Sequence, residues 1–347
     1  MQIRDLYHTL QRTRTLETDR IHALPIAILM PHSACNCRCV MCDIWKDNKN
    51  LKQLTEADIK DLLITFKKLG TQQVLMSGGE ALLNPNFFKL CELLKPHKIS
   101  VVLLTTGLSV RKHAYDIIKY VDELIVSLDG DEQLHDQIRN IPHAFRKMKE
   151  GLDFIRFLKP DFKITARTVI HRMNYQKWPD IIQTARSMGI QQISFLPADV
   201  SSHAFNRQMA WETPRQNEVL IQENELQELI KMVNKVVIIS RRHPGLVAES
   251  DEKLYNIYRY YAAFYGLNPF PFKKCNAPWV STVIEADGSV KPCFFHESMG
   301  NIRDKSLNEI LNTPEAIAFR KMLKTGQNDT CARCVCSLNL PPTTRLN

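Results

Sequence analysis

The sequence predicts an α/β fold built on a parallel sheet, with a smaller module at its carboxyl end. Six short apolar runs alternate with segments of helical periodicity between Pro25 and Pro197. Polar or glycine-containing segments follow the first four runs, and the pattern changes after Pro197. Strands that alternate with helices pair in parallel, because each helix carries the chain back across the sheet. Periodicity alone leaves open whether that sheet is flat or closes into a barrel.

The six apolar runs are the expected strands: Ile26–Met30, Gln73–Met76, Ser100–Leu104, Glu123–Val126, Lys163–Ile170 and Gln192–Leu196. Helical periodicity between them is clearest at Glu56–Leu69, Asn86–Leu94 and Pro179–Met188. The first four strands are followed by Cys35–Cys42, Ser77–Glu80, Thr105–Gly107 and Ser127–Gly130. The carboxyl ends of parallel strands form the ligand face of barrels and of open α/β sheets. These four segments therefore predict one binding site.

The chain after Pro197 is organised differently. Residues 198–219 are polar and irregular, and they predict a linker or lid. The elements expected beyond them are helices at Leu226–Val233 and Leu254–Tyr265, and strands at Ser281–Ala286 and Val290–Phe294. The Asp287-Gly288 pair between the two strands favours a two-residue turn, which predicts a hairpin.

The composition predicts a soluble, cytoplasmic protein. Of the 347 residues, 44% are hydrophobic and 24% are charged, which is ordinary for a globular protein. No stretch approaches the roughly 18 apolar residues of a membrane span, and the amino terminus lacks the apolar core of a secretory signal. The net charge of +9 suits an anionic partner, or reflects only a lysine-rich solvated surface. Lysine and arginine are spread along the chain, which argues against a nucleic-acid partner.

The ten cysteines fall mainly into two groups, which predicts metal sites in a reducing compartment rather than disulfides. In the first group, Cys35-x3-Cys39-x2-Cys42 follows the first strand, with Cys37 in between. Three thiolates on one short loop can hold three irons of a four-iron cluster and leave the fourth iron open. The alternative is a structural zinc site built from all four thiolates.

This three-cysteine spacing after the first strand resembles the hallmark of the radical S-adenosylmethionine (SAM) superfamily. The Gly78-Gly79-Glu80 segment and SLDGDEQLHDQIR (residues 127–139) resemble the family's segments after strands two and four. The resemblance covers about residues 26–197 and implies a partial (β/α)6 TIM-like barrel. It also implies that Cys35, Cys39 and Cys42 hold a [4Fe-4S] cluster whose open iron is chelated by SAM. Electron transfer to SAM would then release a 5′-deoxyadenosyl radical.

The resemblance implies SAM contacts from several loops: Met41, Gly78, Gly79, Glu80, Ser127, Arg139, Arg167 and Asn174. Glycine carbonyls would bind the SAM amino group with Glu80 in support, and Arg139 could pair with the SAM carboxylate. Met41 stands where the family usually places an aromatic residue against the adenine, a contact that a polarizable sulfur can also make. Arg167 stands where related enzymes often have Asn, and is expected to reach SAM or an anionic substrate, or else to form a structural salt bridge. Cys37 is expected to be a bystander.

The second cysteine group predicts an auxiliary cluster. Cys275 and Cys293 flank the expected hairpin, and Cys331 and Cys334 lie beyond it. This order, with GNIRDKSLNEI at residues 300–310, resembles the Twitch module, a shortened relative of the SPASM domain. The resemblance implies a small C-terminal α+β iron–sulfur domain with a second [4Fe-4S] cluster. Four thiolates would leave no open iron, which suits electron transfer. Cys336 could replace Cys334 as a ligand, and a four-cysteine zinc site is the alternative.

The expected domains are an N-terminal extension (1–25), the radical SAM partial barrel (26–197), a linker and helix (198–240) and the Twitch/SPASM-like domain (241–347). The first functional hypothesis is a radical SAM oxidoreductase that abstracts hydrogen from an unactivated carbon of a small polar biosynthetic substrate. Its electron donor would be a protein such as flavodoxin or ferredoxin. The second is a peptide-modifying maturase of a ribosomal natural product, although only about 25 residues precede the first strand. The third is a non-catalytic, zinc-bearing RNA-binding protein.

Overall fold

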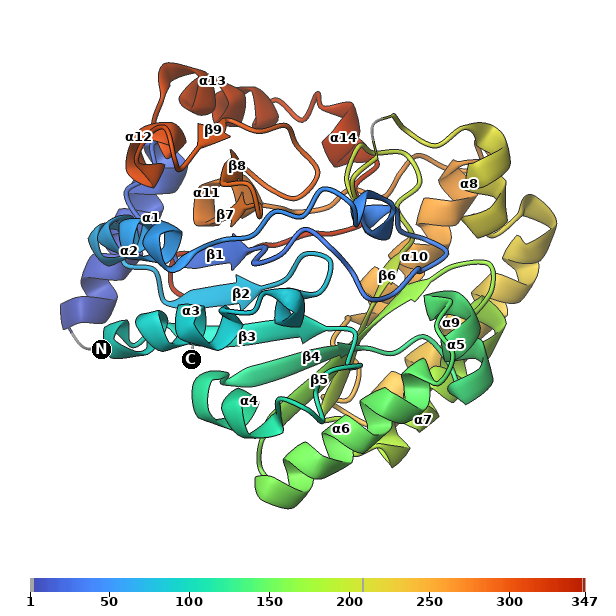
Figure 1. Ribbon diagram of the computed structural model, residues 1–347. Coiled ribbons are helices and arrows are strands. Elements are labelled where there is room, and N and C mark those ends of the chain that lie inside the picture. The colour runs from blue at the N-terminus through green and yellow to red at the C-terminus, as the bar shows by residue number, and fades with distance from the viewer. Residues whose placement is uncertain (1–2, 208, 345, 347) are drawn as a thin grey trace.

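The computed structural model describes residues 3–207, 209–344 and 346. In this part of the chain, nine strands form one sheet with the order β6-β5-β4-β3-β2-β1-β7-β8-β9 (Figure 1). The strands are β1 (Ile26–Leu29), β2 (Gln73–Met76), β3 (Ser100–Thr105), β4 (Glu123–Ser127), β5 (Lys163–Ile170), β6 (Gln192–Pro197), β7 (Ser281–Ile284), β8 (Ser289–Lys291) and β9 (Gly300–Asn301). Strands β1 to β6 pair in parallel in chain order. The predicted partial (β/α)6 barrel is confirmed, and each of its strands ends within one residue of the expected position.

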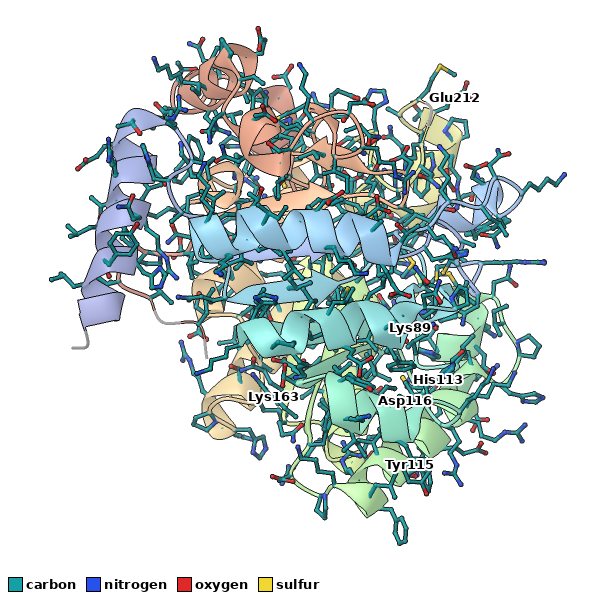
Figure 2. All side chains as sticks on the ribbon, turned by 60° about the vertical axis from the view of Figure 1, so that its left-hand side comes forward. Lys89, His113, Tyr115, Asp116, Lys163 and Glu212 are labelled. Carbon is teal, nitrogen blue, oxygen red and sulfur yellow. The ribbon has the colours of Figure 1, made fainter. Side chains whose placement is uncertain are left out.

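Helices cover the convex face of the parallel strands (Figure 1). They are α2 (Glu56–Leu69), α3 (Phe87–Leu94), α4 (Ala114–Tyr120), α5 (Glu132–Arg139), α6 (Ala144–Leu158) and α7 (Trp178–Ser187). In β4, Leu124 and Val126 are fully buried, whereas the alternate residues Ile125 and Ser127 are only half-buried on the concave face. Charged side chains such as Lys89 and Asp116 project from the outer surface of α3 and α4 (Figure 2).

Helix α2 shows how local sequence fixes these elements. Thr55 and Asp58 form a capping box at its start, in which each side chain accepts a hydrogen bond from the other residue's backbone N–H. Gly70 ends the helix with φ at 65°, a left-handed conformation that glycine adopts without steric cost. Phe66 is among the residues buried along one helix face. Capping and burial therefore agree on where this helix begins, ends and packs.

The C-terminal module continues the barrel sheet. Strand β7 pairs in parallel with β1, from Ile26 opposite Ser281 to Leu29 opposite Ile284, and β8 and β9 follow antiparallel. The predicted hairpin is confirmed, but β8 ends at Lys291 rather than Phe294, because Pro292 has no N–H for a sheet hydrogen bond. The helices of the module are α11 (Ala277–Val280), α12 (Leu307–Leu311), α13 (Pro314–Leu323) and α14 (Asp329–Ala332). The sequence did not predict that this module would join the barrel sheet.

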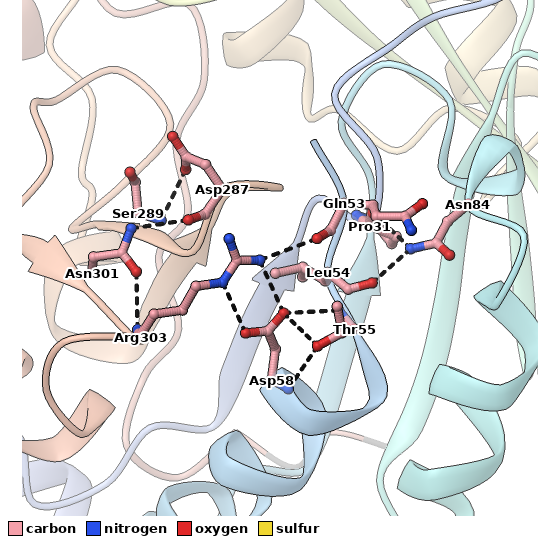
Figure 3. Close-up of polar contacts among 10 residues, drawn as sticks. All are labelled: Pro31, Gln53, Leu54, Thr55, Asp58, Asn84, Asp287, Ser289, Asn301 and Arg303. Atoms are coloured by element: carbon pink, nitrogen blue, oxygen red, sulfur yellow. Dashed lines mark hydrogen bonds and ion pairs between the residues drawn. The ribbon is translucent and has the colours of Figure 1, made fainter. Parts of the chain in front are cut away.

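A polar clamp fastens the module to the start of α2 (Figure 3). The Arg303 guanidinium lies 3.1 Å from both Asp58 carboxylate oxygens and donates to the Gln53 carbonyl at 3.1 Å. Asn301 holds Arg303 in place by accepting from its backbone N–H at 2.9 Å. Burial would raise the pKa of Asp58, but hydrogen bonds from Arg303 and Thr55 lower it. The clamp therefore joins an ionised carboxylate of the barrel to a cation of the module.

Three helices lie between the barrel and the module: α8 (Thr213–Val219), α9 (Leu226–Arg242) and α10 (Asp251–Ala263). The region 198–219 is therefore not wholly irregular, since Pro214 starts α8. Helix α10 packs on α9 and β6, and the hydroxyl group of its Tyr260 donates to the Ala198 carbonyl at 3.1 Å. The aromatic residues of α10 thus serve packing. This helix lies beyond the expected boundary at residue 241, and the domain limits stay predictions.

The two ends of the described chain pack against the sheet. Helix α1 (Ile3–Thr18) occupies the expected N-terminal extension, where the sequence analysis predicted no helix. The segment after α14 returns across the concave face, where Leu340 is buried with Ile26 of β1 and with Trp279 of α11. Asn276 holds this segment through hydrogen bonds to the backbone of Leu340. No helix among the described residues is both long enough and apolar enough to cross a membrane.

Candidate functional site

The first cysteine loop follows β1 and is held from two sides by backbone hydrogen bonds. On one side, Glu80 N–H donates to the Ala34 carbonyl at 3.0 Å. On the other, Arg38 N–H donates to the Arg139 carbonyl at 3.0 Å. The loop is therefore fixed between the segment after β2 and the end of α5. This is the arrangement expected from loops that share the carboxyl edge of a parallel sheet.

The thiols of Cys35, Cys37, Cys39 and Cys42 lie close enough to change one another's acidity. Burial is the main cause that raises the pKa of Cys35 and of Cys42 to about 12. A hydrogen bond with Cys37, together with the Arg139 charge, lowers the pKa of Cys39 to about 6 despite its burial. Cys37 is thus a buried neighbour of Cys39 and lies within the group.

Three soft thiol ligands on one anchored loop fit a four-iron cluster, which requires thiolates. Among the described residues, no three His, Cys, Asp or Glu side chains surround a single metal position. A cluster does not require such a position, because each thiolate binds a different iron.

The glycines of the Gly78-Gly79-Glu80 segment allow it to lie against the cysteine loop. A Cβ atom on Gly79 would lie 2.2 Å from the Ala34 carbonyl oxygen, which is far inside van der Waals contact. Gly78 has φ at 110°, a conformation that residues with side chains rarely adopt. The sequence requires glycine here because two backbones meet, as expected for a loop that presents its backbone to a ligand.

Glu80 lies fully buried below this loop and joins it to the end of β3. Its carboxylate accepts hydrogen bonds from the Thr105 hydroxyl, from the Thr106 hydroxyl and N–H, and from Leu82 N–H, all between 2.7 and 3.2 Å. Burial raises the pKa of Glu80 although these donors oppose the shift. The carboxylate therefore orders the loops after β2 and β3, and any support for a SAM amino group would come through that framework.

Arg139 points at the cysteine loop, but its charge is already paired. Its Nε and Nη2 lie 2.7 and 2.5 Å from one oxygen of the fully buried Asp129, and its Nη1 lies 3.4 Å from Cys39 Sγ. Burial alone would lower the pKa of Arg139, but the Asp129 carboxylate raises it, so the guanidinium stays charged. This geometry links the β4 segment to one predicted cluster ligand. The expected pairing of Arg139 with a SAM carboxylate stays a prediction.

The other expected SAM contacts lie on β4 and β5 and on the loops that follow β1 and β5. Met41 is buried within the cysteine loop, and Ser127 ends β4 on the concave face. Arg167 lies opposite Ser127 in the register of β4 and β5 and is exposed there, with its Nε 3.3 Å from the Ser194 hydroxyl. Asn174 is fully buried, and its amide bonds to the Asp129 and Val169 carbonyls and to His171 N–H. Asn174 thus braces the loops beside the site and has no free amide group.

The second cysteine group is also brought together. Burial is the main cause that raises the pKa of Cys293 to about 12, and the nearby thiols of Cys331 and Cys275 add to the shift. Cys334 lies near Cys293, and its pKa is raised mainly by burial. Cys336 N–H bonds to Cys334 Sγ at 3.4 Å, so its backbone wraps around that sulfur. Four thiols in one place fit the predicted auxiliary cluster.

A cavity of about 750 Å³ is lined by sequence neighbours of both cysteine groups. Asp43 lines it from the first group, Phe294 and His296 from the second, and Phe205 and Arg207 from the segment after β6. That segment belongs to residues 198–219, which the sequence predicts to be a linker or lid. It is held by a buried ion pair between Arg207 and Asp199 at 2.5 Å, and by Trp211, whose indole N–H donates to Asp43 at 2.7 Å. A volume of this size suits a small-molecule ligand.

Sequence reasoning missed two residues of this region. His296 Nε2 lies 3.3 Å from Cys331 Sγ, and the ring packs edge-on against Phe319. Its position three residues after Cys293 was the available signal. Arg207 has no local signal, because its partner Asp199 and the residues that it covers become neighbours only when the lid folds.

The sequence profile of the radical SAM superfamily matches residues 29–185, and that of an iron–sulfur cluster-binding domain, SPASM, matches residues 275–335. Fe-coproporphyrin III synthase of Methanosarcina barkeri is 25% identical over 330 residues, covering 89% of this chain and 80% of that protein. PqqA peptide cyclase of Bradyrhizobium diazoefficiens is 25% identical over 331 residues, covering 91% and 80%. The crystal structure of Streptococcus suis SuiB bound to S-adenosylmethionine has the same fold, with a TM-score of 0.65 at 14% identity over 95% of this chain and 78% of that one.

Proposed function

This chain belongs to the radical SAM superfamily and carries an iron–sulfur cluster-binding domain at its carboxyl end, and on that premise we propose that it oxidises a small polar biosynthetic substrate. Family membership makes it an enzyme and excludes the non-catalytic zinc protein. Cys35, Cys39 and Cys42 would hold the cluster that supplies the 5′-deoxyadenosyl radical from SAM. The four thiols of Cys275, Cys293, Cys331 and Cys334 would hold a second cluster, which supplies an electron acceptor.

One observation carries this proposal. Residues next to both thiol groups line one cavity: Asp43 follows Cys42 of the first group, and Phe294 follows Cys293 of the second. Abstraction of one hydrogen atom leaves a substrate radical. Loss of a proton and of one electron from that radical completes a two-electron oxidation. Glu80 and Asp129 brace the loops around the first thiol group.

The test begins with anaerobically reconstituted enzyme. We expect iron and acid-labile sulfide for two four-iron clusters, and 5′-deoxyadenosine when SAM and a reductant such as reduced flavodoxin are added. Replacing Cys35, Cys39 and Cys42 together with Ala should remove one cluster and all SAM cleavage. The Cys37→Ser variant should retain both clusters and should still cleave SAM. Stoichiometric zinc without sulfide, or cleavage by the triple variant, would contradict the proposal.

A peptide-modifying maturase is the second candidate. It is supported by the match to PqqA peptide cyclase over 91% of the chain. The two candidate functions are distinguished by the substrate that the wild-type enzyme converts. The rate of SAM cleavage without any substrate is the baseline for this comparison. Modification of a precursor peptide encoded beside the gene would favour the maturase, and turnover of a small polar metabolite would favour the oxidoreductase.

A further inference from the structure

A second cavity of about 430 Å³ lies on the concave side of the sheet, between β5, β6, the start of α10 and the C-terminal cysteine segment. We call it the β5–β6 pocket, and its polar lining includes Arg167, Ser194, Glu249, Lys253, Lys273 and Cys336. Among the described residues, Cys336 is the one cysteine that lines this pocket, and none of Cys35, Cys39, Cys42, Cys275, Cys293, Cys331 and Cys334 does. Its walls nevertheless come from both the barrel and the auxiliary module.

Strand register places this pocket next to the predicted SAM site. Phe195 packs on Trp178 of α7 with ring centroids 5.2 Å apart, so the neighbouring Ser194 faces the opposite, concave side. Ser127, Arg167 and Ser194 are consecutive partners in the register of β4, β5 and β6. Neighbouring strands lie about 4.8 Å apart. A group bound at Arg167 would therefore lie one strand from Ser127, the expected SAM contact.

The charges of the pocket favour an anion. Four basic side chains line it, against two acidic ones: Arg167, Lys253, Lys273 and Lys274 against Glu249 and Glu252. Among the described residues, the Arg167 guanidinium makes one hydrogen bond, from its Nε to the Ser194 hydroxyl at 3.3 Å. No carboxylate of the described chain lies within 4.0 Å of this guanidinium. The two terminal nitrogens of this group are therefore available, and their planar fork matches a carboxylate or a phosphate.

Two buried polar atoms in the pocket have no hydrogen-bond partner among the described residues: Glu249 Oε2 and Lys273 Nζ, the second of which lies over the Tyr260 ring. Buried polar atoms are normally hydrogen-bonded, because leaving them unpaired costs free energy. Burial raises the pKa of Glu249 to about 7, although the Phe195 backbone and the Arg167 charge oppose the shift. Glu249 is thus neutral in a good part of the population near pH 7 and can donate a hydrogen bond to an anion.

We propose that the β5–β6 pocket binds the anionic group of the substrate, a carboxylate or a phosphate, with Arg167 as its principal partner and the carboxyl group of Glu249 beside it. This deepens the proposed function and rests on it. An anion held there would place the rest of the substrate toward Ser127 on one side and toward the cysteine segment on the other. The sequence predicts that Arg167 reaches SAM or an anionic substrate, or else forms a structural salt bridge. Its position in this pocket favours the anionic substrate.

The proposal has a distinctive pH dependence. The charged groups that face Glu249 are Arg167 from β5, Glu252 and Lys253 from α10, and Lys273 from the cysteine segment, which also carries the Cys336 thiol. Burial lowers the pKa of Lys273 and raises that of Glu249 to about 7. Below that pH Glu249 is neutral and assists the anion, and above it the negative charge of Glu249 repels the anion. Binding should therefore weaken as pH rises through about 7.

The experiment uses the reconstituted enzyme with SAM bound, so that anions do not occupy the SAM site. Saturation-transfer NMR measures the Kd of acetate and of inorganic phosphate at about pH 6, and that of acetate again at about pH 8, where its own charge is unchanged. Methylammonium is the probe of opposite charge. Binding of acetate alone assigns a carboxylate, and binding of phosphate alone assigns a phosphate.

The variants separate this pocket from general surface charge. Arg167→Met should weaken anion binding by about tenfold, the loss expected for a charge-assisted hydrogen bond. Lys163→Met is the matched control, because Lys163 lies on the same strand at its exposed amino end, paired with Glu123 (Figure 2). It should change the anion Kd by less than about twofold and leave SAM cleavage unchanged. Glu249→Gln should remove the pH dependence of acetate binding.

Several outcomes would overturn the proposal: no anion binding by the wild type, equal weakening in Lys163→Met, tighter binding of methylammonium than of acetate, or an unchanged pH dependence in Glu249→Gln. An Arg167→Met enzyme that loses SAM affinity but binds acetate as the wild type does would assign Arg167 to SAM instead. SAM cleavage by the wild type is measured in the same samples. Anion binding without SAM cleavage would refute the proposed function but leave the pocket assignment standing. SAM cleavage without anion binding would refute the pocket assignment but leave the proposed function standing.

Discussion

The structure makes a specific prediction for Arg139, which lies between a buried carboxylate and a predicted cluster ligand. In Arg139→Gln, the Asp129 carboxyl group, which has no exposed surface, would lose its cationic partner. Removing one member of a buried pair costs about 3–5 kcal/mol. With an unfolding entropy of about 2.1 cal/mol/K for each of the 347 residues, that cost corresponds to a fall in Tm of about 4–7 °C. The Cys39 thiolate would also lose its nearest cation, so cluster occupancy should fall.

Thermal unfolding and SAM binding should be measured on the same anaerobic samples. Arg146→Gln is the matched control, because Arg146 pairs with Glu150 on the exposed surface of α6 at 3.9 Å. Its loss should cost less than about 1 kcal/mol. The double variant Asp129→Asn with Arg139→Gln should recover part of the lost stability, since no unpaired charge remains. If Arg139→Gln kept the wild-type Tm but lost SAM affinity, the guanidinium would serve the SAM carboxylate, and our account of the Asp129 pair would be wrong.

Three further perturbations test the framework. Gly79→Ala places a methyl group against the Ala34 carbonyl, which should cost about 1–3 kcal/mol and lower iron occupancy; a wild-type iron content would refute the close approach. Arg303→Met should cost about 1 kcal/mol in urea unfolding at neutral pH. Because the folded-state pKa of Asp58 is lowered, this difference should be lost as pH falls below about 4, and a difference that persists in acid would contradict the clamp. His296→Phe removes a hydrogen-bond donor to Cys331 and should make the midpoint potential of the second cluster more negative by about 40 mV, as measured by redox titration with EPR detection. An unchanged potential would show that His296 only packs.

The barrel could be predicted closely because its signals are local. Buried parallel strands read as short apolar runs, and turn residues such as Pro25 and Gly70 mark their limits. The pairing of β7 with β1 left no such signal, because Ser281 and Ile26 meet only through tertiary packing. Helix α1 was missed for a related reason. Its exposed face carries Leu6 and Leu10, so hydrophobic periodicity does not mark a buried side.

The residues of the site also fall into those that local sequence predicts and those that depend on tertiary contacts. Cysteine spacing and the Gly78-Gly79 pair could be predicted, since each reflects what one loop must do by itself. The partners of polar side chains could not be predicted, because they depend on which loops meet. The amide of Asn174 joins the Asp129 carbonyl to the His171 N–H, and no local pattern indicates these two partners. Glu249 carried no motif, and only the fold places its carboxylate beside Arg167.

The unpredicted strand pairing also explains how this chain could set the separation of its two thiol groups. The first cysteine loop leaves the carboxyl end of β1, and the hairpin that leads to Cys293 leaves the carboxyl end of its neighbour β7. Adjacent strands keep a spacing of about 4.8 Å, so the two loops begin from fixed, neighbouring positions. The ion pair between Arg303 and Asp58 adds a second contact between the module and the barrel beside that junction. A linker between independent domains would allow the distance between the two groups to vary, whereas a shared sheet with a lateral clamp holds it constant. Because electron transfer depends steeply on distance, a rigid connection of this kind is what an auxiliary electron acceptor requires.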